Sequence, residues 1–216
     1  LNKTTLLLRN SVLTDNSALV AGGALWASGS LIDANSNDLR SNFAGEGAGV
    51  LMNEGSSGIF VASTITSNRA RWGGALSIYS SSIEMRVADI SSNVGGALAF
   101  NNSQGILQRV EVLDNCDYGG IFTASSHVQV HGSPIANNTA ACDPELYKGT
   151  PKLLQFRIGL SNTLRVRLEQ VKILDIYTSK QRGRTTLYYE AGTDYDMAHA
   201  FFNMSKQLTT RYSYSP

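Results

Sequence analysis

Charged residues are scarce in this chain of 216 residues. Only 16% of the residues are Asp, Glu, Lys or Arg, whereas a typical soluble domain has about a quarter. The formal net charge is +1, so we expect no broad electrostatic attraction toward nucleic acid and no nucleic-acid partner. Asn, Ser, Gly and Ala take the place of the missing charges.

Long apolar runs are missing as well. No stretch approaches the roughly 20 apolar residues that a membrane-spanning helix needs, so we expect no membrane span in this segment. The first residues lack the pattern of a signal peptide and include LLLRNSVL, an apolar pattern already under way. We therefore expect an internal piece of a larger multidomain protein.

The motifs of several cofactor and metal sites are missing too. The Gly-Gly-Ala segments lack the lysine of a phosphate-binding loop and the spacing of a dinucleotide-binding loop. His127 and His131 fall on one face of a strand, but at that spacing they lie too far apart to hold one metal ion. We expect neither a cofactor nor a metal.

Clustered carboxylates, which polysaccharide hydrolysis requires, are not evident. The acidic residues are scattered, and we find no position at which they repeat to make a cluster; they include Asp15, Asp33, Asp38, Glu46, Glu54, Glu84 and Asp89. A lyase would need a calcium-binding acidic set beside a basic residue, and the arginines have no such set in register. We therefore expect no catalytic residues and no enzyme.

What the chain has instead is a repeat. An aliphatic residue stands three positions before each of six asparagines, at steps of 26, 26, 25, 22 and 23; they are Asn16, Asn42, Asn68, Asn93, Asn115 and Asn138. A pair of small residues follows five of them: Gly22-Gly23, Ala48-Gly49, Gly73-Gly74, Gly95-Gly96 and Gly119-Gly120. A motif in two parts at such a period indicates a solenoid.

Two kinds of solenoid have this period. A leucine-rich repeat needs a buried leucine five residues before each asparagine, and that position here holds Ser11, Asn37, Ser63, Ala88, Val110 and Ser133. It also needs a helix or short turn where the glycines stand, and each glycine weakens a helix by about 1 kcal/mol. A parallel β-helix fits better, because IEMRVADI and ILQRVEVL alternate as strands and glycine suits tight corners. The six asparagines would then stack along one edge as a ladder.

These repeats resemble those of chlamydial polymorphic outer-membrane proteins, in which Ser-x-Phe-x-x-Asn precedes Gly-Gly-Ala-Ile/Leu. They are also similar to the pectin-lyase-like β-helices of protist and green-algal surface proteins. The chain has SVLTDN, STITSN and ADISSN, each followed by GGAL, with Leu or Ile where that family prefers Phe. The resemblance covers about residues 1–140. It implies a right-handed β-helix of about six rungs and a surface location, such as a cilium or cell wall.

The only two cysteines, Cys116 and Cys142, lie 26 residues apart, near one rung. Such a pair in a secreted chain predicts a disulfide, with two buried thiols as the alternative. Four glycosylation sequons also favour a secretory route; they begin at Asn2, Asn101, Asn137 and Asn203. We therefore expect a disulfide-bonded glycoprotein that is extracellular or on the cell surface.

The composition changes near Tyr147 to Pro151. Residues 1–147 hold 16 of the 20 glycines and a formal charge of −5 (7 basic, 12 acidic), whereas residues 148–216 carry +6 (11 basic, 5 acidic). Two helical stripes follow at spacings near four, namely Phe156, Leu160, Leu164 and Leu168, and Met197, Phe201, Met204 and Leu208. VKILDIYTS and TTLYYEA alternate as strands between them. We expect a β-helix domain over 1–147 and a small α+β module of order α-β-β-α over 148–216, which resembles a SEA-like or ferredoxin-like module.

The sequence thus predicts a mostly β, non-catalytic, structural or adhesive extracellular protein that acts as a spacer or assembly element. The partners expected from the sequence are other protein chains of an extracellular assembly, and glycans. The alternative is a carbohydrate-binding or carbohydrate-active β-helix protein, a lyase or hydrolase. An exposed aromatic row would favour binding, and carboxylates in register in a groove would favour an enzyme.

Overall fold

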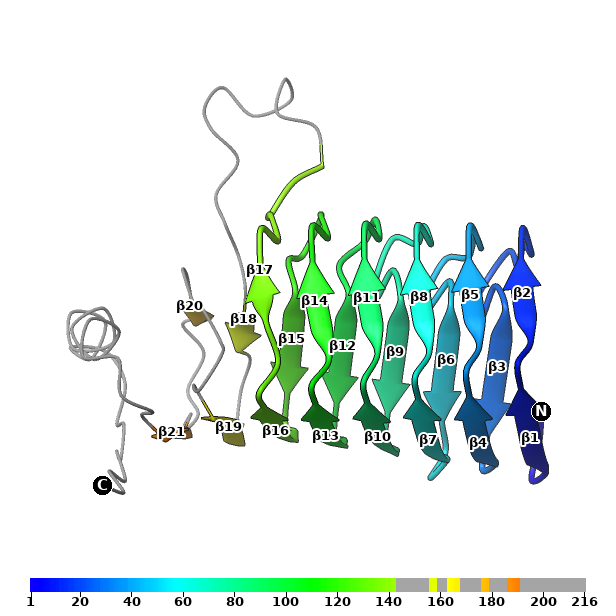
Figure 1. The fold of residues 1–216 in the computed structure, drawn as a ribbon, viewed down its shortest axis with the longest axis horizontal. Helices are drawn as coiled ribbons and strands as arrows, with labels where there is room; N and C mark the ends of the chain where they lie inside the picture. The colour runs from blue at the N-terminus through cyan, green and yellow to red at the C-terminus, as the bar shows by residue number, and fades with distance from the viewer. Residues whose placement is uncertain (143–155, 159–162, 168–175, 179–185, 191–216) are drawn as a thin grey trace.

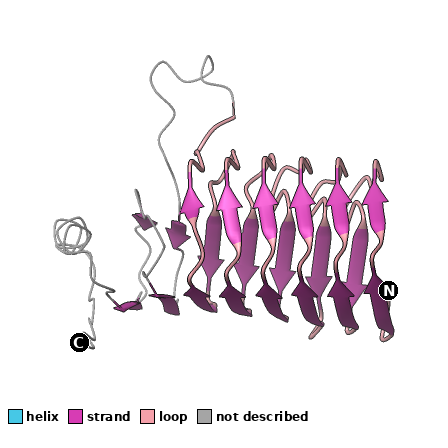
Figure 2. Ribbon diagram, viewed as in Figure 1, coloured by secondary structure: helices cyan, strands magenta, loops and turns pink. Residues whose placement is uncertain are grey.

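The computed structural model describes residues 1–142, 156–158, 163–167, 176–178 and 186–190. Its strands pair in parallel and form three sheets, which wind around one core as a parallel β-helix (Figure 1). Figure 2 shows strands joined by turns and loops, with no helix in the described part of the chain. The mostly β, parallel β-helix part of the predicted fold class is confirmed.

Each rung of the coil contributes one strand to each sheet. Sheet 1 contains β1 (Thr5–Arg9), β4 (Leu31–Asn35), β7 (Ser57–Val61), β10 (Ser82–Arg86), β13 (Gln104–Gln108), β16 (His127–His131), β19 (Thr163–Arg167) and β21 (Thr186–Glu190). Sheet 2 contains β2 (Val12–Thr14), β5 (Asp38–Arg40), β8 (Thr64–Thr66), β11 (Asp89–Ser91), β14 (Glu111–Leu113) and β17 (Ile135–Ala136). Sheet 3 contains β3 (Leu25–Ser28), β6 (Val50–Asn53), β9 (Leu76–Tyr79), β12 (Leu98–Asn101), β15 (Ile121–Ala124), β18 (Phe156–Ile158) and β20 (Ile176–Thr178).

The core is a stack of aliphatic and aromatic side chains that point inward from all three sheets. In β10, for example, Ile83 and Met85 are buried while the residues between and beside them face outward. This alternation follows from the two-residue period of a strand. Gly105 leaves room for a large neighbour, because a Cβ there would lie only 2.6 Å from the ring of Phe100. The result is one continuous hydrophobic core along the coil.

Sharp corners join the three sheets, and most of them are not made by glycine. At least one residue with a positive φ stands between consecutive strands of residues 1–142, for example Ala62 (φ 48°), Ser67 (φ 56°) and Ser80 (φ 45°) in the third rung. The second residue of the small pair has a different role in the first three rungs, where it is Gly23, Gly49 or Gly74. A Cβ on Gly74 would lie 2.3 Å from the carbonyl oxygen of Val94 on the next rung. These glycines therefore permit close main-chain stacking in the loop before sheet 3.

The first helix predicted for residues 148–216 is wrong. Phe156–Ile158 and Thr163–Arg167 are strands β18 and β19, which pair in parallel with β15 and β16. A spacing of four residues keeps side chains on one face of a strand as well as of a helix. The alternation of Leu164 and Val166 within β19 was the signal for a strand.

The two strands predicted for residues 148–216 can be compared with the structure, whereas the domain boundary and the second helix cannot. Strands were predicted over VKILDIYTS and TTLYYEA, and β20 and β21 lie within them, although they belong to different sheets. The predicted boundary at residues 147–151 and the second predicted helix at residues 197–208 lie outside the described residues. Among those that are described, no helix has the length and hydropathy needed to cross a membrane.

Candidate functional site

The six repeat asparagines lie in one ladder at the corner that follows sheet 2. The Oδ1 atom of Asn68 accepts hydrogen bonds from the main-chain N and the Nδ2 of Asn42, at 3.0 and 2.9 Å. Its own Nδ2 donates to Asn93 Oδ1 and to the carbonyl oxygen of Leu39. The same pattern runs from Asn16 to Asn138. Because their donors and acceptors serve the neighbouring rungs, these side chains hold the corner together.

A second ladder, which the sequence analysis missed, lies at the corner between sheets 3 and 1. The main-chain N–H of each corner serine donates to the side-chain hydroxyl of the corner serine in the next rung. The serines that form this ladder are Ser30, Ser56, Ser81, Ser103 and Ser126. Each of these serines stands twelve positions before the next ladder asparagine. That constant offset was a readable signal, but serine is too common in this chain to draw attention.

The two cysteines form a disulfide. The sulfur atoms of Cys116 and Cys142 are 2.02 Å apart, with the Cα atoms 4.9 Å apart. Cys116 follows the ladder residue Asn115 directly, and the main-chain N of Cys142 donates to Asp117 Oδ1 at 3.0 Å. The bond therefore joins the fifth rung to the chain that leaves the sixth.

Three of the four sequon asparagines, Asn2, Asn101 and Asn137, lie in the described residues and are exposed. Asn203 lies outside them. Asn2 is in the first rung, Asn101 ends β12, and Asn137 sits at a corner with φ 57°. They are far apart in the sequence, and only Asn101 lines the hollow described below.

The expectation that the acids never repeat at one position is wrong. Asp38, Asp89 and Glu111 all begin strands of sheet 2, with Thr64 between the first two. Asp89 and Glu111 are therefore direct neighbours on consecutive rungs. Each of these four residues stands four positions before a ladder asparagine, so the register was readable in the sequence. Neither residue lines the hollow, so the pair does not supply it with carboxylates.

His127 and His131 lie on the outward face of a strand, as the sequence predicted. His127 and His131 point outward from β16, with Gln129 between them, and Gln129 Nε2 lies 3.0 Å from His127 Nε2. Within the described residues, no group of three or more His, Cys, Asp or Glu side chains is placed to hold a metal ion.

The most distinctive surface feature arises from a short loop in the fourth rung. Seven residues separate Asn68 from β9, but only four separate Asn93 from β12. In the longer loops Glu46 pairs with Trp72 through a parallel bridge, and the described part of the chain has no further bridge from Trp72 to the fourth rung. The shortened loop therefore leaves the outer face of sheet 3 uncovered at the end of β12, where Asn101 is exposed, while Ala99 is buried.

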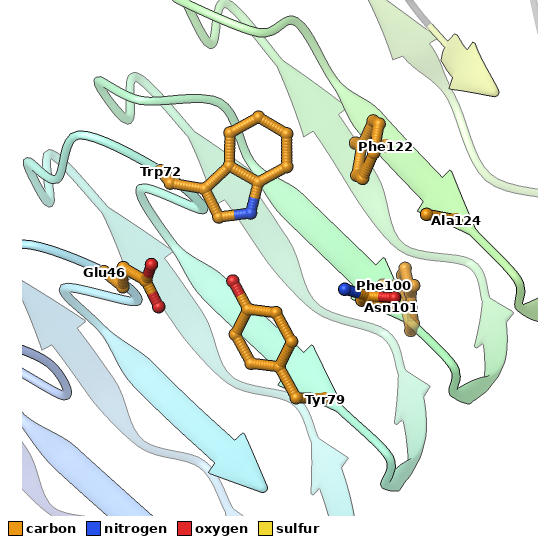
Figure 3. A pocket seen from close by; sticks show the side chains of 7 residues that line it. All are labelled: Glu46, Trp72, Tyr79, Phe100, Asn101, Phe122 and Ala124. Carbon is orange, nitrogen blue, oxygen red and sulfur yellow. The ribbon is translucent and has the colours of Figure 1, made fainter. Parts of the chain in front are cut away.

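This opening is an aromatic hollow of about 390 Å³ (Figure 3). Its lining residues come from several rungs: Glu46, Trp72, Tyr79, Phe100, Asn101, Phe122 and Ala124. Register explains its depth. Asn101 stands between Tyr79 and Ala124 in sheet 3, and Ala99 stands beside Phe122 two positions earlier, so the fourth and fifth rungs present mostly short side chains here.

Aromatic rings form the upper wall of the hollow. The indole of Trp72 meets Tyr118 and Phe122 edge to face, with ring centroids 4.5 and 4.7 Å apart. Such contacts fix ring orientation beyond what simple burial does. Trp72 and Phe122 are only partly buried and Tyr118 is 39% exposed. The cluster thus presents apolar ring surface to solvent.

The polar edge of the hollow is a hydrogen-bonded pair. Figure 3 shows the Tyr79 hydroxyl directed toward Glu46 and the Trp72 indole nitrogen. Partial burial, the negative charge of Glu46 and the hydrogen bond to that carboxylate raise the pKa of Tyr79 to about 12. Tyr79 therefore stays protonated at neutral pH and donates to Glu46, which keeps acceptor capacity for a further hydroxyl or amide.

Sequence reasoning did not find this hollow. Trp72 lies in a loop, Tyr79 and Phe122 lie at outward strand positions of different rungs, and Phe100 belongs to the core, so no motif connects them. The loop lengths after each asparagine were visible and could have suggested an opening at the fourth rung. Which aromatic side chains border that opening depends on the register of sheet 3.

Comparison with known proteins agrees with the architecture. Residues 22–143, more than half of the chain, match the family model described as right handed beta helix region. No curated protein and no solved structure matches the chain. The parallel coil, the three sheets and this match together place the chain in the right-handed β-helix family.

Proposed function

We propose that the chain is a non-catalytic structural or adhesive element of an extracellular or cell-surface protein. The observation that carries this proposal is the disulfide between Cys116 and Cys142, because such bonds persist in oxidising compartments. The three exposed sequon asparagines support the same route. The resemblance to repeats of outer-membrane and protist surface proteins agrees with it.

The internal order of the coil supports a structural role. Ladder asparagines and corner serines both use their side chains to bond one rung to the next. A rod built in this way presents long, regular faces, which suit it to connect or space other chains of an assembly. We propose other protein chains as its main partners.

Labelling of intact cells from the source organism tests the location. An antibody raised against the chain should stain non-permeabilised cells or the surrounding matrix, and a membrane-impermeant thiol reagent should modify the protein only after reduction. Staining that requires permeabilisation, together with free thiols in the native protein, would refute the proposal.

A second candidate function is carbohydrate binding, and the aromatic hollow favours it. Sugars present flat C–H surfaces to aromatic rings and hydroxyls to carboxylates, and the hollow offers Trp72, Phe122 and Glu46 for these contacts. Titration with soluble oligosaccharides, followed by tryptophan fluorescence, tests it. Saturable quenching that is lost in Trp72→Leu and kept in Trp26→Phe would support binding.

A further inference from the structure

The hollow and the sequon at Asn101 coincide. Asn101-Asn102-Ser103 is a sequon, and Asn101 is the exposed last residue of β12, on the floor of the hollow between Tyr79 and Ala124 (Figure 3). No hydrogen bond engages its side-chain amide within the described part of the chain. Asn2 and Asn137 are exposed too, but neither lines the hollow.

We infer that Asn101 carries an N-linked glycan whose first sugar residues pack into the aromatic hollow. The inference rests on the proposed secretory route. Parallel strands lie about 4.8 Å apart, so a sugar ring on Asn101 Nδ2 is within contact distance of Tyr79 on the neighbouring strand. The rings of Trp72 and Phe122 provide the apolar surface, and Glu46 accepts a hydrogen bond from the sugar.

The chemistry of attachment is a group transfer from a lipid-linked oligosaccharide diphosphate. Nδ2 of Asn101 forms a bond to C1 of the terminal N-acetylglucosamine, while the bond between C1 and the diphosphate oxygen breaks. The diphosphate leaves with that electron pair, and the amide gives up one proton.

Because the hydroxyl of the sequon serine is buried in the folded chain, the glycan must be attached before the fourth rung closes. Ser103 is 4% exposed, and its Oγ donates to the carbonyl oxygens of Ile78 and Asn101. Because the transfer requires the sequon to be accessible, it precedes closure of the fourth rung. The glycan then meets the hollow as the rungs stack.

Occupancy is tested by mass spectrometry of glycopeptides from the protein isolated from its source. We expect a glycan on Asn101. If Asn2 or Asn137 is modified and Asn101 is not, the inference is wrong while the secretory route stands. If all three are unmodified, the inference is wrong, and intact-cell labelling decides the proposed function separately.

Packing is tested in the full chain made with a secretion leader in a eukaryotic host. The variant Trp26→Phe leaves Trp72 as the only tryptophan. In this background, Asn101→Gln should increase iodide quenching of Trp72, shift its emission to longer wavelength and lower the melting temperature by roughly 2–4 °C, the scale for one lost aromatic contact in a chain of this size. The matched control Asn2→Gln should change none of these.

Two further experiments show whether the effects of Asn101→Gln come from loss of a packed glycan or from the substitution itself. In protein from a host that does not glycosylate, Asn101→Gln should have no effect, and in Trp72→Leu its effect on melting should disappear. Equal quenching of Trp72 with and without the glycan overturns the inference. So does saturable quenching by free chitobiose in protein that carries the Asn101 glycan, because the hollow would then be open to an external sugar.

Discussion

A buried asparagine in this coil bonds to two rungs at once. Asn93 donates through Nδ2 to Asn115 Oδ1 and to the carbonyl oxygens of Ile65 and Ser91, and its Oδ1 accepts from Asn68. Asn16, at the first rung, is exposed and donates to Asn42 only. The same residue type therefore contributes very differently along the ladder.

Asn93→Ala should lower the free energy of unfolding by about 3–5 kcal/mol, because it leaves several buried donors and acceptors unpaired. Asn16→Ala should cost about 1 kcal/mol or less, since water can replace its partners. Denaturant unfolding of the two variants measures both. Equal losses would contradict the ladder as the source of the difference.

Tyr79 predicts a dependence of stability on alkaline pH. Its pKa is raised to about 12 in the folded chain, against about 10 for an unperturbed tyrosine. Its stabilising contribution is therefore complete below pH 10 and is lost as the pH rises toward 12, because the unfolded state releases its proton first.

Denaturant unfolding between pH 9 and 11.5 checks this prediction. The wild-type chain should lose more stability over that range than Tyr79→Phe, which has no proton to release. Parallel curves for the two proteins would show that Tyr79 titrates normally.

At the scale of one rung, the loop before sheet 3 decides how closely main chains stack. Gly74→Ala should cost about 3 kcal/mol, because the added Cβ meets the carbonyl oxygens of Val94 and Gly96 at 2.3 and 2.6 Å. The control is Gly29→Ala, at a corner where Ser80 and Asn102 show that other residues accept a positive φ. It should cost about 1 kcal/mol. A smaller loss for Gly74→Ala than for Gly29→Ala in thermal unfolding would count against this steric explanation.

The disulfide stabilises the last described rungs. Replacing both Cys116 and Cys142 with Ala should lower the free energy of unfolding by roughly 3 kcal/mol, the value expected for a loop of this size. Reduction of the wild-type protein should give a similar loss. Unfolding curves of oxidised wild-type protein and the double variant that coincide would refute this prediction.

At the scale of the whole molecule, the three sheets form one rod with side chains in register along its faces. Asp89 and Glu111 are the one pair of acidic neighbours that this register makes on sheet 2 within the described strands. They lie on a strand face outside the aromatic hollow, which itself contains one carboxylate, that of Glu46. Two carboxylates on opposite sides of a bound sugar, as glycoside hydrolysis needs, are not brought together there.

Purified chain should therefore release neither reducing ends nor unsaturated products from neutral or acidic polysaccharides. The assay should include Glu46→Gln and Glu111→Gln beside the wild-type protein. Turnover that persists through purification and is lost in either variant would show that the chain is an enzyme.

The sequence alone determined the repeat. The asparagine, the aliphatic residue three positions earlier and the following small pair are all local features, and a residue that must stack on its own copies leaves a period that can be counted. The ladder, the strands of residues 1–142 and the position of the cysteines on neighbouring rungs could be inferred for that reason. The prediction of a helix at residues 156–168 was wrong, because apolar residues spaced four apart lie on one face of a strand as well as on one face of a helix.

The tertiary structure decided which outward side chains the loops cover and which they leave exposed beside one another. The steps between asparagines vary from 22 to 26, yet Asp89 and Glu111 each stand four positions before a ladder asparagine, and Tyr79, Asn101 and Ala124 each stand fourteen before one. Strand pairing places these residues side by side as those offsets imply. The aromatic hollow exists because one loop is short and the side chains of neighbouring rungs border the gap. Contacts of this kind join residues more than 20 positions apart, and only the register of the parallel sheets brings them together.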